Sequence, residues 1–453
     1  MLAVPGFRPP LTDALPHLLP HPRPHPRPHP RAPWPALALT LLPSLALALV
    51  LNLLSPALSR AAPPAADKAP SHKTKAHAGK AKHKAKGPSA KAARGPAAVP
   101  GDSYQQRQDA QQWAEDAASR LDLPAPWLRQ QLAKARRIPL IEQLVLPSPQ
   151  PSAKNWAAYR ARFIEPRRIE AGRLFWQRHR DTLARAEATY GVPASLVVGV
   201  LGVETLYGQH MGQFRILDAL ATLAFDFPGA HPRAAERQTF FRGELEQFLR
   251  LTQAAGTDPS SVRGSYAGAM GLPQFMPSSW RHHAVDFDGD GRIDLFNSPA
   301  DAIGSVANYF RAFQWKPGMP THYPVALRAE PQELERLLAP DILPTFSVAS
   351  FTQLGAQLQG EALQHGGPLA LIELRNGDDP PSYVAGTENF YAVTRYNWSS
   401  YYAMAVIELG AAVQERLTGA TTPTAPTAPT APTSPTASTS PAVPTASTHT
   451  RGP

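Results

Sequence analysis

Residues 195–208 read Ser-Leu-Val-Val-Gly-Val-Leu-Gly-Val-Glu-Thr-Leu-Tyr-Gly. This segment predicts a helix in the core of the protein. Every residue from Leu196 to Val203 is apolar or glycine, which is typical of a helix that is buried on all sides. Glu204 follows directly, and a carboxylate is almost never placed there without a partner or a task. Burial raises the pKa of a carboxyl group, so that it can act as an acid near neutral pH. From this segment alone, a catalytic acid and a paired structural glutamate remain equally open.

The composition shows that the chain is not uniform. It has 453 residues, enough for two or three domains, and 51 prolines that gather at its two ends. It contains no cysteine. Disulfides, a cysteine-ligated zinc, a thiol nucleophile and a lipid-modified N-terminal cysteine are therefore excluded.

The net charge of +10 is unevenly distributed. Residues 61–95 carry a net charge of +8 and residues 1–60 carry +4, whereas residues 96–450 carry −3. The basic charge belongs to the flanks, so we expect no specific binding of nucleic acid by the folded part.

The flanking segments predict export. Residues 1–59 contain a Pro/His/Arg-rich start and then an uncharged apolar stretch, which together indicate a signal peptide or an uncleaved inner-membrane anchor. A periplasmic location follows in either case. Residues 60–101 form a Lys/Ala/Pro-rich linker, either a solvated spacer or a contact for anionic polymers, and residues 419–453 form a Thr/Ala/Pro-rich tail.

Residues 102–418 are predicted to fold, and their pattern is mainly helical with a small β-containing insertion. The expected helices cover residues 105–121, 127–136, 156–163, 169–190, 236–254, 299–313 and 400–417, besides the helix that carries Glu204. The expected strands cover residues 323–327, 369–374, 383–385 and 390–394.

An acidic loop follows in the middle of this region. Asp286, Asp288 and Asp290 alternate and Gly291 comes next, which matches the front of an EF-hand loop with oxygen ligands for Ca²⁺. Position 12 is Asn297 rather than the usual bidentate glutamate. The alternative is a solvated acidic turn without an ion. We interpret the loop as an ion site and the ion as structural rather than as a switch.

A further segment, residues 265–280, reads Ser-Tyr-Ala-Gly-Ala-Met-Gly-Leu-Pro-Gln-Phe-Met-Pro-Ser-Ser-Trp, which suits either a sugar groove or a tight turn between helices. With it, six motifs stand in one order, and the chain resembles the membrane-bound lytic murein transglycosylase B family over about residues 110–415. The motifs are Gly202–Gly208, Asp218–Asp226, Ser265–Trp280, Asp286–Asp294, Asp301–Tyr309 and Asn389–Asn397.

The resemblance implies a lysozyme-like core, a groove for peptidoglycan glycan strands and Glu204 as the single acid/base. It also implies sugar contacts and a calcium site. The implied sugar-binding residues are Ser265, Gln274, Tyr309, Asn397 and Tyr402. The implied calcium ligands are Asp286, Asp288, Asp290, the carbonyl of Arg292, and Asp301.

Ordinary glycosidases use two carboxylates, and the nearest partners for Glu204 in the sequence are Asp218 and Asp226. Each lies in an apolar pattern and is expected to be a helix cap or a salt-bridge partner. A reaction with one carboxylate, which closes a 1,6-anhydro ring on the muramoyl sugar, therefore fits better. The alternatives are a hydrolytic muramidase and a non-catalytic cell-wall binding protein.

Overall fold

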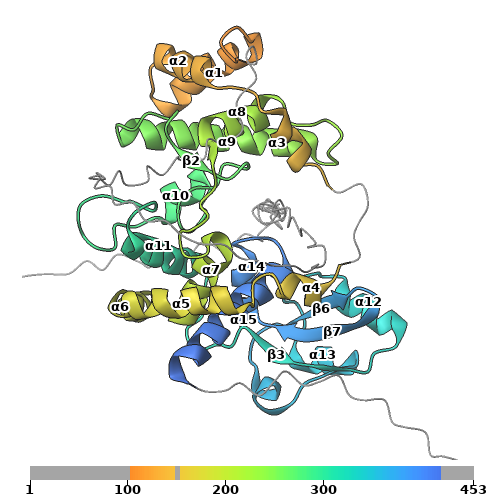
Figure 1. The fold of residues 1–453 in the computed structure, drawn as a ribbon. Helices are drawn as coiled ribbons and strands as arrows, with labels where there is room; N and C mark the ends of the chain where they lie inside the picture. Colours follow the sequence, from red (N-terminus) through yellow and green to blue (C-terminus); the bar gives the residue numbers. More distant parts are fainter. Residues whose placement is uncertain (1–102, 148–153, 420–453) are drawn as a thin grey trace, which may run out of the picture. The chain divides into compact units, whose positions relative to one another are not determined.

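Helices dominate residues 103–147 and 154–419, which are the residues that this computed structural model describes (Figure 1). All of them belong to one unit. The predicted export segment, the linker and residues 420–453 of the tail lie outside the described residues. The helices are α1 Gln108–Leu121, α2 Ala125–Lys134, α3 Pro139–Leu144, α4 Trp156–Arg160, α5 Pro166–Arg178, α6 Arg180–Tyr190, α7 Ala194–Thr205, α8 Ile216–Phe225, α9 Ala234–Ala254, α10 Pro277–His283, α11 Pro299–Ala312, α12 Pro331–Leu338, α13 Val348–Gln353, α14 Glu388–Thr394, α15 Ser400–Thr418 and the 3-10 helix Gly360–Gln364.

The central core is built around α7. This helix is buried on nearly all sides, as its apolar sequence predicts, and it packs closely against α15. Glycine permits the close approach, because a Cβ atom at Gly199 would lie 2.1 Å from the carbonyl oxygen of Val406, and one at Gly410 would lie 2.1 Å from that of Ser195. Two helix backbones thus touch at this crossing, which fixes the side chains of α15 relative to Glu204.

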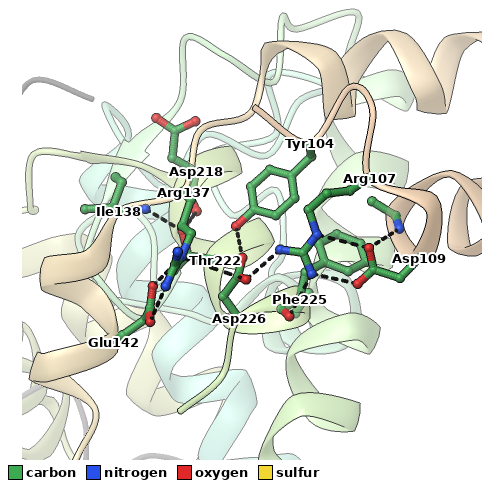
Figure 2. A network of polar contacts seen from close by, with 12 residues as sticks. Tyr104, Arg107, Asp109, Arg137, Ile138, Glu142, Asp218, Thr222, Phe225 and Asp226 are labelled. Atoms are coloured by element: carbon green, nitrogen blue, oxygen red, sulfur yellow. Dashed lines mark hydrogen bonds and ion pairs between the residues drawn. The ribbon is translucent and has the colours of Figure 1, made fainter. Parts of the chain in front are cut away.

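A second core joins α1, α2, α3, α8 and α9 through buried apolar side chains. Asp218 and Asp226 lie at the start and the end of α8, and both form polar contacts within this core. Asp218 forms an ion pair with Arg215, and Asp226 accepts hydrogen bonds from Tyr104 and Arg107. Figure 2 shows the side chains of Tyr104 and Arg107 both pointing toward the carboxylate of Asp226. Both aspartates therefore have the structural roles that the sequence predicted.

The small β-containing insertion holds a third core. Strands β3 His322–Pro324, β7 Asp379–Gly386 and β6 Ala370–Asn376 pair antiparallel in that order. Two-residue strands form separate pairs, β1 Phe214–Arg215 with β2 Arg263–Gly264 and β4 Ala326–Leu327 with β5 Ala356–Gln357. The mainly helical fold with a small sheet insertion is the one that the sequence predicted.

Several expected elements differ in the structure. The single strand expected over residues 323–327 is two short strands, because β3 pairs with β7 and β4 pairs with β5 in a separate sheet. The helix expected over residues 156–163 ends at Arg160. The strand expected over residues 390–394 is instead part of α14, because the Thr387 side chain caps a helix whose Phe390 and Val393 are buried at helical spacing. The single helix expected over residues 169–190 is two helices, since the backbone leaves the helical conformation at His179. Within the described ranges, no single helix has the length and apolar composition to cross a membrane, although α6 and α7, bent by 116°, meet that test as a pair.

Candidate active site

Glu204 lies in the last turn of α7 and keeps partial access to solvent. Its Oε1 accepts a hydrogen bond of 2.6 Å from the hydroxyl of Tyr402, a fully buried residue in the first turn of α15. Burial raises the pKa of Glu204 to about 7, while the Tyr402 hydrogen bond lowers it. A carboxyl with this pKa can hold a proton and also give it up near neutral pH.

Two causes set this pKa, namely burial and the hydrogen bond from Tyr402. No second carboxylate in the described part of the chain contributes to it. Asp218 and Asp226 belong to the second core and have cationic or phenolic partners there. Neither aspartate therefore pairs with Glu204.

Two further tyrosines, Tyr159 of α4 and Tyr396, lie close enough to feel the charge of Glu204. Burial raises the pKa of each phenol, and the negative charge of Glu204 raises it further. The Tyr396 ring stacks on that of Tyr402, with 6.2 Å between the centroids. Sequence reasoning missed both residues. Tyr396 stands beside Asn397 in a quoted motif and could have been included, whereas no local pattern marks Tyr159.

The segment containing Ser265 and Gln274 is a tight turn beside the end of α7. Ser265 is fully buried, and its Oγ accepts a hydrogen bond from the amide of Ala269. Gln274 is partly exposed, and its Nε2 donates to the carbonyl oxygens of Gly271 and Met211 at 2.9 and 3.2 Å. Ser265 therefore shapes the turn, and Gln274 is the residue of the two that solvent can reach.

Tyr309 and Asn397 are both buried. The Tyr309 hydroxyl donates to the carbonyl oxygen of Arg395 at 2.6 Å, and its ring lies 4.8 Å from that of Tyr396. Asn397 is 3% exposed, and its Oδ1 has no hydrogen-bond partner among the described residues. An unpartnered buried acceptor next to Tyr396 is suited to a donor from a bound ligand.

The acidic loop brings three carboxylates together. Oxygens of Asp286, Asp288 and Asp290 lie within 4.8 Å of one another, a donor set that fits a hard cation such as Ca²⁺. Asp301, on α11, is buried, and its two oxygens accept hydrogen bonds of 2.8 Å from the amides of Phe287 and Asp294. Asp301 thus joins the two sides of the loop.

Arg292, expected to bind an ion through its carbonyl oxygen, projects its side chain into solvent, where the guanidinium lies 3.9 Å from Asp290. The loop is joined to the turn beside α7, because the amide of Leu272 donates to the carbonyl oxygen of Leu295 at 2.8 Å. The predicted ion site and the predicted sugar site therefore share a backbone connection.

Comparison with known proteins identifies close relatives of this arrangement. The model of the transglycosylase SLT domain family matches residues 105–411. Membrane-bound lytic murein transglycosylase B of Escherichia coli (strain K12) is 40% identical over 324 residues, which cover 69% of this chain and 84% of that protein.

Solved structures agree with this match. The Escherichia coli lytic transglycosylase Slt35, in complex with calcium, is 38% identical with a TM-score of 0.60, covering 69% of this chain and 95% of that one. SltB3 from Pseudomonas aeruginosa, in complex with NAG-anhNAM-pentapeptide, is 30% identical with a TM-score of 0.58, covering 70% of this chain and 80% of that one. The fold is that of the lysozyme-like lytic transglycosylases.

Proposed function

Because this chain belongs to the transglycosylase SLT domain family and is a lytic transglycosylase that acts on peptidoglycan, we propose that Glu204 is its single acid/base catalyst. We propose further that it cleaves the β-1,4 bond between N-acetylmuramic acid and N-acetylglucosamine and leaves 1,6-anhydromuramoyl ends. The observation that carries this proposal is the lone carboxyl group of Glu204, with a pKa of about 7 and a hydrogen bond from Tyr402.

The reaction needs two proton transfers, and Glu204 takes part in both. Glu204 in its acid form donates a proton to the glycosidic oxygen, and the bond from that oxygen to C1 of the muramoyl sugar breaks. The 2-acetamido oxygen of the same sugar stabilises the positive charge at C1, as in substrate-assisted glycosidases. The Glu204 carboxylate then takes the proton of the 6-hydroxyl, whose oxygen forms a bond to C1. Water is not consumed, and Glu204 ends in its starting acid form.

The remaining predicted residues have supporting roles in this proposal. Tyr402 holds Glu204 in position through its hydrogen bond. The partly exposed Gln274 and the unpartnered oxygen of Asn397 are suited to hydroxyl and acetamido groups of the glycan. Ser265 and Tyr309 are as buried as Asn397, but their hydroxyl groups already have hydrogen-bond partners, so we assign them to shaping the wall of the groove rather than to contact with a sugar.

We assign calcium to the acidic loop as a structural ion, held by Asp286, Asp288, Asp290 and the Arg292 carbonyl oxygen. The close carboxylates support this assignment, as does the calcium complex of the Escherichia coli relative. Asp301 would orient the loop and could bind the ion only through lone pairs that its two backbone hydrogen bonds leave free. An ion here would neutralise the mutual repulsion of the three carboxylates.

The partner in this proposal is the peptidoglycan glycan strand, and the place of action is the periplasm, after export through the apolar segment in residues 1–59. The ligand of the Pseudomonas aeruginosa relative, which contains an anhydro sugar, supports both the substrate class and the anhydro product.

The test compares Glu204→Gln with the wild type on purified peptidoglycan, and mass spectrometry analyses the released muropeptides. We expect anhydromuramoyl ends from the wild type and almost no release from Glu204→Gln, since general acid–base help contributes a factor on the order of 10²–10⁴. Products heavier by one water would identify a hydrolytic muramidase, and glycan binding without release would identify a cell-wall binding protein.

Glu244→Gln is the matched control. Glu244 is also a buried glutamate whose pKa burial raises, but Ser278 satisfies its carboxylate within the packing of α9 against α10. Its substitution should leave the products unchanged. Comparable activity of Glu204→Gln and Glu244→Gln would refute the assignment of Glu204.

A further inference from the structure

The hydroxyl of Thr205, the residue after Glu204, joins the end of α7 to two other places in the backbone. Its Oγ1 donates to the carbonyl oxygen of Leu272 at 2.9 Å and accepts from the amide of Gly208 at 3.0 Å. Thr205 is fully buried. The bond to Leu272 is buried and the bond from Gly208 is partly buried, so losing the hydroxyl would leave a buried carbonyl oxygen and a partly buried amide without their partner.

The segment that receives this bond, residues 271–274, is held by side chains along its length. Each of its first three carbonyl oxygens accepts a hydrogen bond from a side chain. These bonds run from Gln274 Nε2 to Gly271 at 2.9 Å, from Thr205 Oγ1 to Leu272 at 2.9 Å, and from Tyr396 Oη to Pro273 at 2.5 Å. The segment therefore links the residue beside the proposed acid, one of the phenols around it, and a predicted sugar-binding amide.

Both sides of this link have an unfavourable backbone conformation. Leu206 and Tyr207 follow Thr205 with φ angles of +50° and +57°, and Gln274 has a φ angle of +50°. The left-handed conformation is unfavourable for an ordinary residue, so it persists only where surrounding contacts enforce it. Half of the six non-glycine residues with positive φ in the described ranges thus lie next to the two ends of the Thr205–Leu272 hydrogen bond.

From this geometry we propose that Thr205 is a positioning residue, whose hydroxyl fixes the last turn of α7 against residues 271–274 and so holds the Glu204 carboxyl group in line with the bound glycan. A second contact supports the same turn, because the buried Arg168 donates through Nη1 to the carbonyl oxygen of Gly202 at 2.5 Å. The Thr205 inference rests on the proposed function, since it acts through Glu204.

The test compares two substitutions at position 205. Thr205→Val keeps the shape of the side chain and removes the hydroxyl, whereas Thr205→Ser keeps the hydroxyl and removes a methyl group. The loss of about 1 Å of precision at a reacting group can cost on the order of 100-fold in rate. We expect Thr205→Val to lower kcat on soluble glycan strands by about tenfold to 100-fold and Thr205→Ser to stay within about threefold of the wild type.

Thr222→Val is the matched control. Thr222 is also a fully buried helical threonine, and its Oγ1 donates to the carbonyl oxygen of Asp218 and accepts from the amide of Ile138. It lies in the second core, away from Glu204. We expect Thr222→Val to lose stability comparably and to keep the kcat of the wild type.

The pH dependence provides a readout that a loss of stability alone would not change. A displaced turn admits water to Glu204 and relieves the desolvation that raises its pKa, so the basic limb of the kcat profile should move to lower pH in Thr205→Val but not in Thr222→Val. If Thr205→Val does not fold, Thr205→Ala replaces it with the same expectation.

Equal kcat values and equal pH profiles for Thr205→Val and Thr222→Val would overturn this inference, as would a Thr205→Ser variant as impaired as Thr205→Val. Failure of the proposed function is distinguishable, because it would appear as turnover by Glu204→Gln. An inactive Glu204→Gln together with an unimpaired Thr205→Val would reject only the role of Thr205.

Discussion

Glu204→Gln should stabilise the protein above neutral pH while it abolishes turnover. The physical reason is that the folded protein holds the pKa of Glu204 at about 7, against an ordinary value of 4.5. A group whose pKa is raised on folding contributes its full stability below pH 4.5 and loses it as the pH rises through 7. The neutral amide has no such dependence.

The magnitude follows from the size of the pKa change. One pKa unit corresponds to about 1.4 kcal/mol, so ionising Glu204 in the folded state costs about 2–3 kcal/mol once its partial exposure is allowed for. The free energy of unfolding of Glu204→Gln minus that of the wild type should therefore be greater at pH 8.5 than at pH 4 by this amount, with the change falling between pH 4.5 and 7.

The assay is urea unfolding of both proteins at several pH values, at one fixed calcium concentration. Other titrating groups cancel in the difference between the two proteins. A difference that is the same at pH 4 and pH 8.5 would show that folding does not raise the pKa of Glu204, and the argument for a single acid of about neutral pKa would fail with it.

Three further predictions follow from other contacts. Tyr402→Phe removes the hydrogen bond to the Glu204 carboxylate, and a hydrogen bond to a charged group is worth about 1.5–3 kcal/mol. The pKa of Glu204 should therefore rise by about one to two units. The basic limb of the kcat/KM profile should move to higher pH by the same amount. Calcium at 100 times its Kd should stabilise the wild type by about 2.7 kcal/mol in thermal unfolding. Asp288→Asn should lose most of this stabilisation. Equal stabilisation of both proteins by calcium would contradict the ion site. Asp226→Asn weakens the hydrogen bonds from Tyr104 and Arg107, so it should lower the free energy of unfolding in urea by about 2 kcal/mol without changing kcat. A large fall in kcat with intact folding would instead give Asp226 a role in catalysis.

Much of the site could be predicted because its signals are local. Glu204 stands out against the apolar run before it, and the aspartates at 286, 288 and 290 alternate along the chain. The buried helix α7 followed in the same way from the absence of polar residues before Glu204. Each of these inferences depends on neighbours in the sequence, so no knowledge of the packing was needed.

Where packing outweighs local preference, the sequence was a poorer guide. Residues 390–394 are rich in aromatic and β-branched side chains and suggested a strand, but the Thr387 cap and the burial of Phe390 and Val393 favour a helix. Tyr159 also escaped notice, because only the folded chain brings its phenol near the charge of Glu204.

The sequence by itself thus determined which carboxyl group would be buried and which loop would bring carboxylate oxygens together. Both features depend on residues that are neighbours in the chain. Only the tertiary structure decided what surrounds that carboxyl group. The contact of α7 with α15 at Gly199 and Gly410 aligns Tyr402 with Glu204, and the Thr205 hydroxyl reaches Leu272 across a turn. Such contacts join residues far apart in the chain, so they form only when the chain has packed.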